Sequence, residues 1–156
     1  MAKRLFALFL FTFLLLAAAK RPPVLSVDPV EVSVSPGETA ESQITVTVKN
    51  GYHVQANPAS ESYLIATKLE VKPAEGIETS SPIYPKGQPY KLEGTDKPLS
   101  TYEKNFVIKV PLKANKDAAA GTRTLQGTLH YQACDAHTCL FPDTIPVAII
   151  VTVTKS

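Results

Sequence analysis

Gln43-Ile44-Thr45-Val46-Thr47-Val48-Lys49 alternates polar and apolar residues without a break, and Asn50-Gly51 follows it. Successive side chains of a β-strand point to opposite faces, so the three aliphatic residues share one face and the polar residues share the other. Asn-Gly favours a tight turn, and the run from Tyr52 to Ala56 continues beyond it. The stretch therefore predicts a β-strand with one buried face, a turn and a further strand.

The same alternation recurs along the chain and sets the fold class. The 13 prolines and the lack of long segments with helical period argue against a helical protein, and only residues 116–120 suggest a single helical turn. Seven or more short strands in about 130 residues predict an all-β, single-domain fold, an immunoglobulin-like antiparallel β-sandwich. The other candidate strands are Leu64 to Val71, Phe106 to Leu112, Leu125 to Tyr131 and Ile145 to Val153.

The N-terminus has the pattern of a secretory signal peptide. Lys3 and Arg4 precede an apolar run from Leu5 to Ala19, which ends in small residues. An uncleaved anchor is the alternative, although the run is short for a membrane span of about 20 residues. We expect residues 1–19 to be a cleaved signal peptide and residues 20–156 to be an exported domain that has no membrane attachment after cleavage.

Charge excludes some classes of partner. The chain has 16 Lys and Arg residues, and removal of Lys3 and Arg4 leaves 14, which equals the 14 Asp and Glu residues. A near-neutral domain without a basic tract argues against binding to nucleic acid or to an anionic membrane surface.

The two cysteines of the chain lie close together in Tyr131-Gln132-Ala133-Cys134-Asp135-Ala136-His137-Thr138-Cys139-Leu140-Phe141-Pro142. In an exported protein, such a pair can form a lasting structural disulfide. A ring of this size removes little chain entropy, and the loop-entropy model gives only about 2 kcal/mol. This small gain argues mildly against a purely structural role, and it leaves that role open.

The second interpretation is thiol:disulfide exchange, in which one thiolate attacks a partner disulfide and the neighbouring thiol resolves the mixed disulfide. A protonated His137 would stabilise a thiolate, whereas Asp135 would oppose it. The third interpretation is a copper or zinc site made by Cys134, His137 and Cys139, with His53 or His130 as a fourth ligand, although the spacing is not that of paired zinc modules. We therefore expect that the protein holds neither a metal ion nor a cofactor.

Strand parity places the pair on the scaffold. Leu129 and Tyr131 are predicted to point inward, so a regular strand would take Cys134 out of the core-facing row. Cys139 then precedes the next strand, next to Phe141, and the pair would lie at one end of the sandwich. Residues 75–100 are rich in Pro and Gly and are the least strand-like stretch; Tyr84 within it either packs in the loop or covers the sulfurs.

The chain resembles the N-terminal periplasmic domain of the DsbD thiol:disulfide interchange reductases. The resemblance covers nearly all of the mature chain, and its most specific part is Tyr131-Gln132-Ala133-Cys134 with Cys139-Leu140-Phe141-Pro142. Supporting matches are Gly51-Tyr52-His53, Asn57-Pro58 and Tyr84-Pro85. Known members have a slightly longer gap between the cysteines and an aromatic residue at the position of Ile83. Full-length members also carry a multi-span membrane domain and a thioredoxin-like domain, neither of which occurs in this sequence.

This resemblance implies a periplasmic domain with a redox-active disulfide. Cys139 would be the attacking sulfur and Cys134 the resolving one. A cap around Ile83-Tyr84-Pro85 would shield the pair, with His53, His137 and Phe141 in the surroundings of the site. The implied partners are thioredoxin-fold proteins, both as electron donor and as acceptor, and we expect a monomer. The alternative is a non-enzymatic sandwich with a structural disulfide that binds a protein or a metal.

Overall fold

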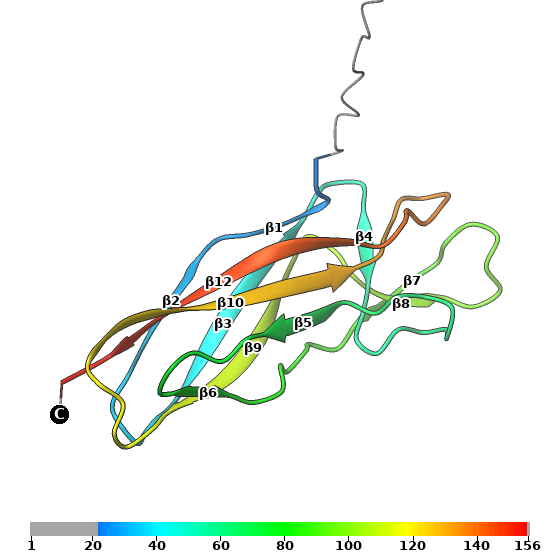
Figure 1. The fold of residues 1–156 in the computed structure, drawn as a ribbon. Helices are drawn as coiled ribbons and strands as arrows, with labels where there is room; N and C mark the ends of the chain where they lie inside the picture. The colour runs from blue at the N-terminus through cyan, green and yellow to red at the C-terminus, as the bar shows by residue number, and fades with distance from the viewer. Residues whose placement is uncertain (1–21, 156) are drawn as a thin grey trace, which may run out of the picture.

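The computed structural model describes residues 22–155, so the predicted signal peptide lies outside the described residues. Within this range the protein is built from strands, which form three four-stranded sheets (Figure 1). The strands are β1 (Leu25–Val27), β2 (Val30–Val34), β3 (Thr39–Val48), β4 (His53–Gln55), β5 (Lys68–Val71), β6 (Ile77–Thr79), β7 (Gln88–Tyr90), β8 (Leu99–Tyr102), β9 (Asn105–Ala114), β10 (Gly121–Tyr131), β11 (Ala133–Cys134) and β12 (Asp143–Val153).

The predicted strand–turn–strand unit is confirmed. β3 extends from Thr39 to Val48, and the backbone N–H of Tyr52 donates to the carbonyl of Lys49 at 3.1 Å to close the turn. Gly51 has a φ of 83°, a left-handed conformation that glycine adopts without a side-chain clash. β4 follows directly, so the turn fixes where the chain enters the third sheet.

Two sheets form the sandwich, and the predicted Ig-like β-sandwich is confirmed. The first sheet has the order β1-β3-β9-β6 and the second has the order β2-β12-β10-β5. Their aliphatic side chains form one core, because alternate residues on each long strand point inward. The innermost of these residues, each 3% exposed or less, are Ile44, Val46, Val48, Ile108, Val110, Leu112, Leu125, Leu129, Ile149, Val151 and Val153.

Local predictions differ from the structure at three places. Residues 116–120 form a turn rather than a helical turn, with the N–H of Ala118 donating to the carbonyl of Asn115. The predicted strand over residues 64–71 begins only at Lys68. Most ladders are antiparallel as predicted, but β2 pairs with β12 in parallel, with Val32 opposite Val151.

The third sheet, β11-β4-β8-β7, lies at the end of the sandwich opposite the C-terminus (Figure 1). It uses part of the Pro-rich stretch that was predicted to be loop, because β7 and β8 pair as a long hairpin (residues 88–102). Gly87 allows this hairpin to begin close to its neighbours: a Cβ at this position would clash with Ser100 Oγ and lie 2.6 Å from Ala56 Cβ. Residues 22–155 contain no helix that is long and apolar enough to cross a membrane.

Candidate functional site

The two cysteines form a disulfide at the third sheet. Cys134 ends β11, and Cys139 pairs with it as an isolated antiparallel bridge, with 3.8 Å between their Cα atoms. The loop between them is closed by backbone hydrogen bonds from Asp135 N to Thr138 O and from Leu140 N to Ala133 O, at 2.9 and 2.7 Å. The disulfide therefore closes a small hairpin that the backbone also holds.

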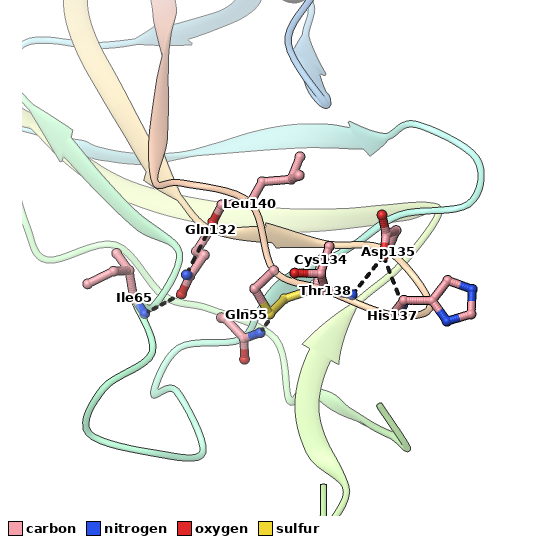
Figure 2. Close-up of a disulfide and its surroundings, with 9 residues drawn as sticks. Gln55, Ile65, Gln132, Cys134, Asp135, His137, Thr138 and Leu140 are labelled. Carbon is pink, nitrogen blue, oxygen red and sulfur yellow. Dashed lines mark hydrogen bonds between the residues drawn. A yellow bond between two sulfur atoms is a disulfide. The ribbon is translucent and has the colours of Figure 1, made fainter. Parts of the chain in front are cut away.

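Asp135 orders the tip of this hairpin (Figure 2). Its Oδ1 accepts hydrogen bonds from the backbone N–H groups of His137 and Thr138, each at 2.8 Å. These two bonds favour the ionised carboxylate and lower the pKa of Asp135. The negative charge predicted near the sulfurs is thus directed at the hairpin backbone.

The two sulfurs differ in their access to solvent. Cys134 is fully buried, whereas Cys139 is partly exposed. A surface hollow of about 310 Å³ adjoins Cys139 and is lined by Gln132, Leu140, Phe141 and Pro142. An incoming thiol or disulfide can therefore reach Cys139, whereas the side chain of Cys134 is not accessible from solvent.

Cys134 is buried for a reason that strand parity does not reveal. Gln132 interrupts the regular strand between β10 and β11, and its side chain is fixed by hydrogen bonds from Ile65 N to Oε1 and from Nε2 to Leu140 O (Figure 2). Ala133 joins the main core, and Cys134 points to the other face, as predicted from alternation. That second face is not open to solvent, because the segment that contains β7 and β8 covers it.

The covered face of the third sheet is a polar layer. Cys134 lies opposite His53 in the β11–β4 ladder, and Gln55 lies opposite Thr101 in the β4–β8 ladder. All four are buried, at 2% exposure or less. The amide Nε2 of Gln55 donates to Cys134 Sγ at 3.2 Å (Figure 2). Buried polar groups on β4 therefore flank the Cys134 sulfur.

The β7–β8 hairpin provides the cover. The ring of Tyr90 in β7 lies on the imidazole of His53. Leu92 and Leu99 of this hairpin are buried, although they do not belong to the main core cluster. Glu93 reaches the disulfide loop, with its Oε2 2.8 Å from His137 Nδ1. Because both side chains of this pair are about three-quarters exposed, water screens it and it contributes little.

The structure brings together some of the predicted site residues and not others. His53 adjoins Cys134, His137 lies in the disulfide loop, and Phe141, which is 95% exposed, stands beyond Cys139. The backbone of Ile83 pairs with Lys109 in β9. The hydroxyl of Tyr84 accepts a hydrogen bond from the backbone N–H of Leu69 in β5 at 2.8 Å.

Ile83 and Tyr84 therefore hold the chain that leads into the hairpin. The next residue, Pro85, accepts a hydrogen bond from the Tyr102 hydroxyl at 2.9 Å, which ties this segment to the end of β8. None of these hydrogen bonds involves the disulfide. The residues that contact the buried side of the site, Gln55 and Tyr90, were missed. Gln55 was detectable, since it is two positions from His53 in the same strand and shares its face.

The histidines and cysteines do not lie together in one cluster within residues 22–155. Both sulfurs are bonded to each other, and His130 lies away on β10 beside Glu70, with 3.7 Å between Nε2 and Oε2. In residues 22–155 no group of three or more His, Cys, Asp and Glu side chains is placed to hold a metal ion.

Fold and site together define an immunoglobulin-like domain with a half-exposed, closely spaced disulfide at one end. The model of the family described as thiol:disulfide interchange protein DsbD, N-terminal, matches residues 21–149. The chain belongs to this family. A comparison with curated protein sequences found no match.

Two solved structures are similar to this chain at low sequence identity. The N-terminal periplasmic domain of ScsB from Proteus mirabilis is 15% identical, with a TM-score of 0.51, over 80% of this chain. This chain spans 43% of that ScsB chain. PapD-like domain 7 of human CEP192 is 12% identical, with a TM-score of 0.44, over 91% of this chain and 94% of that chain.

Proposed function

We propose that this protein is a periplasmic thiol:disulfide exchange domain that uses Cys139 and Cys134 as its redox pair. It takes electrons from a thioredoxin-like donor and passes them to oxidised periplasmic thiol proteins. The observation that supports this most directly is the asymmetry of the disulfide, with Cys139 accessible and Cys134 buried beside a polar layer. A structural disulfide has no need for one reachable sulfur.

The exchange has two steps. In the reduced protein, the thiolate of Cys139 attacks a partner disulfide and forms a mixed disulfide with one partner sulfur. Cys134 then attacks the Cys139 sulfur, closes the intramolecular disulfide and releases the partner as a dithiol. The partner gains two electrons and this domain loses them. The electron donor then reduces the Cys134–Cys139 disulfide by the same two steps in reverse order.

Partner contact falls on the apolar surface next to Cys139. Phe141 is almost fully exposed, and Leu140 and Pro142 line hollows on both sides of it. The N-terminal domain of ScsB is described as periplasmic. By family membership we assign the same compartment here, after removal of residues 1–19, and a monomeric domain over residues 20–156 that meets thioredoxin-fold partners through this surface.

Trapping of the mixed disulfide tests the proposal. C134A leaves Cys139 without its resolving partner, so it is expected to accumulate a reducible covalent complex with an oxidised thioredoxin-fold protein. C139A is the matched control, since its remaining thiol is buried and is expected to form little complex. Absence of any adduct in C134A would refute the exchange function and leave a structural disulfide in a binding domain. A reduction potential below about −300 mV would point the same way.

A further inference from the structure

His53 is placed beside the resolving sulfur without a hydrogen-bond partner of its own. It is the cross-strand neighbour of Cys134, and directly opposed residues in an antiparallel pair present their side chains on the same face. The residue is 2% exposed, and its Nε2 is buried and makes no hydrogen bond. A buried nitrogen of this kind normally has a partner.

Gln55 shows the same deficiency on the other side of the sulfur. Its Nε2 donates to Cys134 Sγ, but its Oε1 is buried and unpaired. Within residues 22–155 only one other buried side-chain atom lacks a partner, Ser42 Oγ, and Ser42 lies in β3 opposite Val110 in the first sheet. An unsatisfied buried polar atom costs about 1–3 kcal/mol. Two of the three such atoms thus belong to the two β4 side chains that flank Cys134.

A reduced Cys134 would supply the partner that His53 Nε2 lacks. The thiol has one S–H donor, whereas the disulfide sulfur has none. His53 Nε2 is capable of accepting a hydrogen bond from it, whereas Gln55 faces the sulfur with its donor, Nε2. The surroundings of Cys134 are therefore better matched to a thiol than to the disulfide.

We propose that His53 accepts the proton of Cys134 when this thiol resolves the mixed disulfide, and that Gln55 positions its sulfur. This inference rests on the exchange function proposed above. In this step the Cys134 S–H bond breaks and the proton moves to His53 Nε2. The Cys134 sulfur bonds to the Cys139 sulfur, and the bond from Cys139 to the partner sulfur breaks. The electron pair of that bond leaves with the partner as a thiolate.

The electrostatic surroundings of His53 support its role as the base. Burial lowers the pKa of the His53 imidazole, which keeps the ring neutral and able to take a proton at neutral pH. Glu103, which follows β8, and Asp135, which follows β11, oppose this shift and would stabilise the imidazolium once it forms. From β7 the ring of Tyr90 lies against the imidazole. The buried thiol of Cys134 thus has a proton acceptor within its own sheet.

The resolving step can be measured alone with oxidised glutathione as the probe. Reduced protein and excess oxidised glutathione form a Cys139–glutathione adduct, whose conversion to the intramolecular disulfide is followed by acid quenching and mass spectrometry. A free thiol with a pKa of about 8.5 is only a few per cent thiolate at pH 7, so loss of the base is expected to slow resolution roughly tenfold there. At a pH well above the thiol pKa, H53Q and wild type are expected to converge.

Three variants separate the roles. H130Q removes a histidine of β10 outside the third sheet and is expected to resolve at the wild-type rate. Q55L is expected to slow resolution at every pH, since it affects the position of the sulfur rather than its proton. An equal slowing of H53Q at all pH values, or no slowing, would overturn the role of His53. Formation of no adduct by wild type would instead overturn the exchange function and this role together.

A measurement on the wild-type protein covers the case in which H53Q fails to fold. The imidazole of His53 is titrated by NMR in the oxidised and the reduced protein. Its pKa is expected to differ between the two states, because only the reduced state offers a thiol to its Nε2. Identical titrations of His53 in both states would reject the inference.

Discussion

The ring of Tyr90 lies on the imidazole of His53, with 3.7 Å between the ring centroids and an angle of 32° between the planes. This contact joins the β7–β8 hairpin to the strand next to Cys134. Aromatic pairs of this kind contribute about 0.5–1.5 kcal/mol beyond the area that they bury. The stack therefore helps to hold the hairpin over the buried sulfur of Cys134.

Removal of the Tyr90 ring is expected to expose Cys134. In C139A the buried Cys134 is the sole thiol, and its labelling by iodoacetamide reports opening of the hairpin. Addition of Y90A is expected to raise the labelling rate by about two- to thirteenfold, given the energy of the stack. Y63A in the same background is the control, because Tyr63 is 72% exposed and its loss should leave the rate unchanged. Equal rates with and without Tyr90 would mean that the hairpin does not control access.

Apolar burial, rather than the Glu93–His137 pair, is expected to hold the hairpin. Leu99 is 3% exposed, and L99A is expected to cost about 2–5 kcal/mol of unfolding free energy. The ion pair is exposed to solvent, so E93Q is expected to cost less than about 1 kcal/mol. Urea unfolding of both variants provides the comparison. A larger loss in E93Q than in L99A would reverse this order.

The close approach of Gly87 predicts that a single methyl group disturbs the start of the hairpin. G87A would place its Cβ against Ser100 and Ala56, and overpacking of this kind costs about 1–3 kcal/mol. Urea unfolding is again the measurement. K86A changes the exposed neighbouring residue and is expected to stay within about 0.5 kcal/mol of wild type. If G87A were as stable as K86A, the backbone would have shifted to accommodate the methyl group without a loss of unfolding free energy.

Asp135 predicts a specific loss of stability in acid. Because its pKa is lower in the folded state than the ordinary value of 3.8, folding favours the ionised form. This contribution is complete above the unfolded pKa and disappears as the pH falls through the folded pKa. Wild type is therefore expected to be more stable than D135N at pH values above 4. This difference in unfolding free energy is expected to shrink as the pH falls below the pKa of the carboxyl in the unfolded state. The unfolding free energies of the two proteins are compared across this range.

A difference between wild type and D135N that stays constant from neutral pH into strong acid would contradict the prediction. In that case the carboxylate charge would contribute nothing, and Asn would differ from Asp only in its packing at the hairpin tip.

Alternation made the sandwich predictable, since β3, β9, β10 and β12 each place one row of aliphatic residues in the core. The same rule gave the face of Cys134 correctly. It could not give the burial of that face, because the cover comes from residues 88–102, where Pro and Gly interrupt any period. The contact between Tyr90 and His53 joins segments far apart in the sequence, and no local pattern encodes it. The resemblance alone suggested Ile83 as part of the cap, and the Pro-rich stretch also suggested Tyr84; their hydrogen bonds lead to β9 and β5.

The parallel pairing of β2 with β12 has a consequence for how the protein is made. β12 lies between β2 and β10 in the second sheet, although it is synthesised after both. Until residues 143–153 leave the ribosome, β2 has no neighbour in its sheet and β10 has one open edge. The core of the domain therefore cannot close before residues 143–153 have been synthesised.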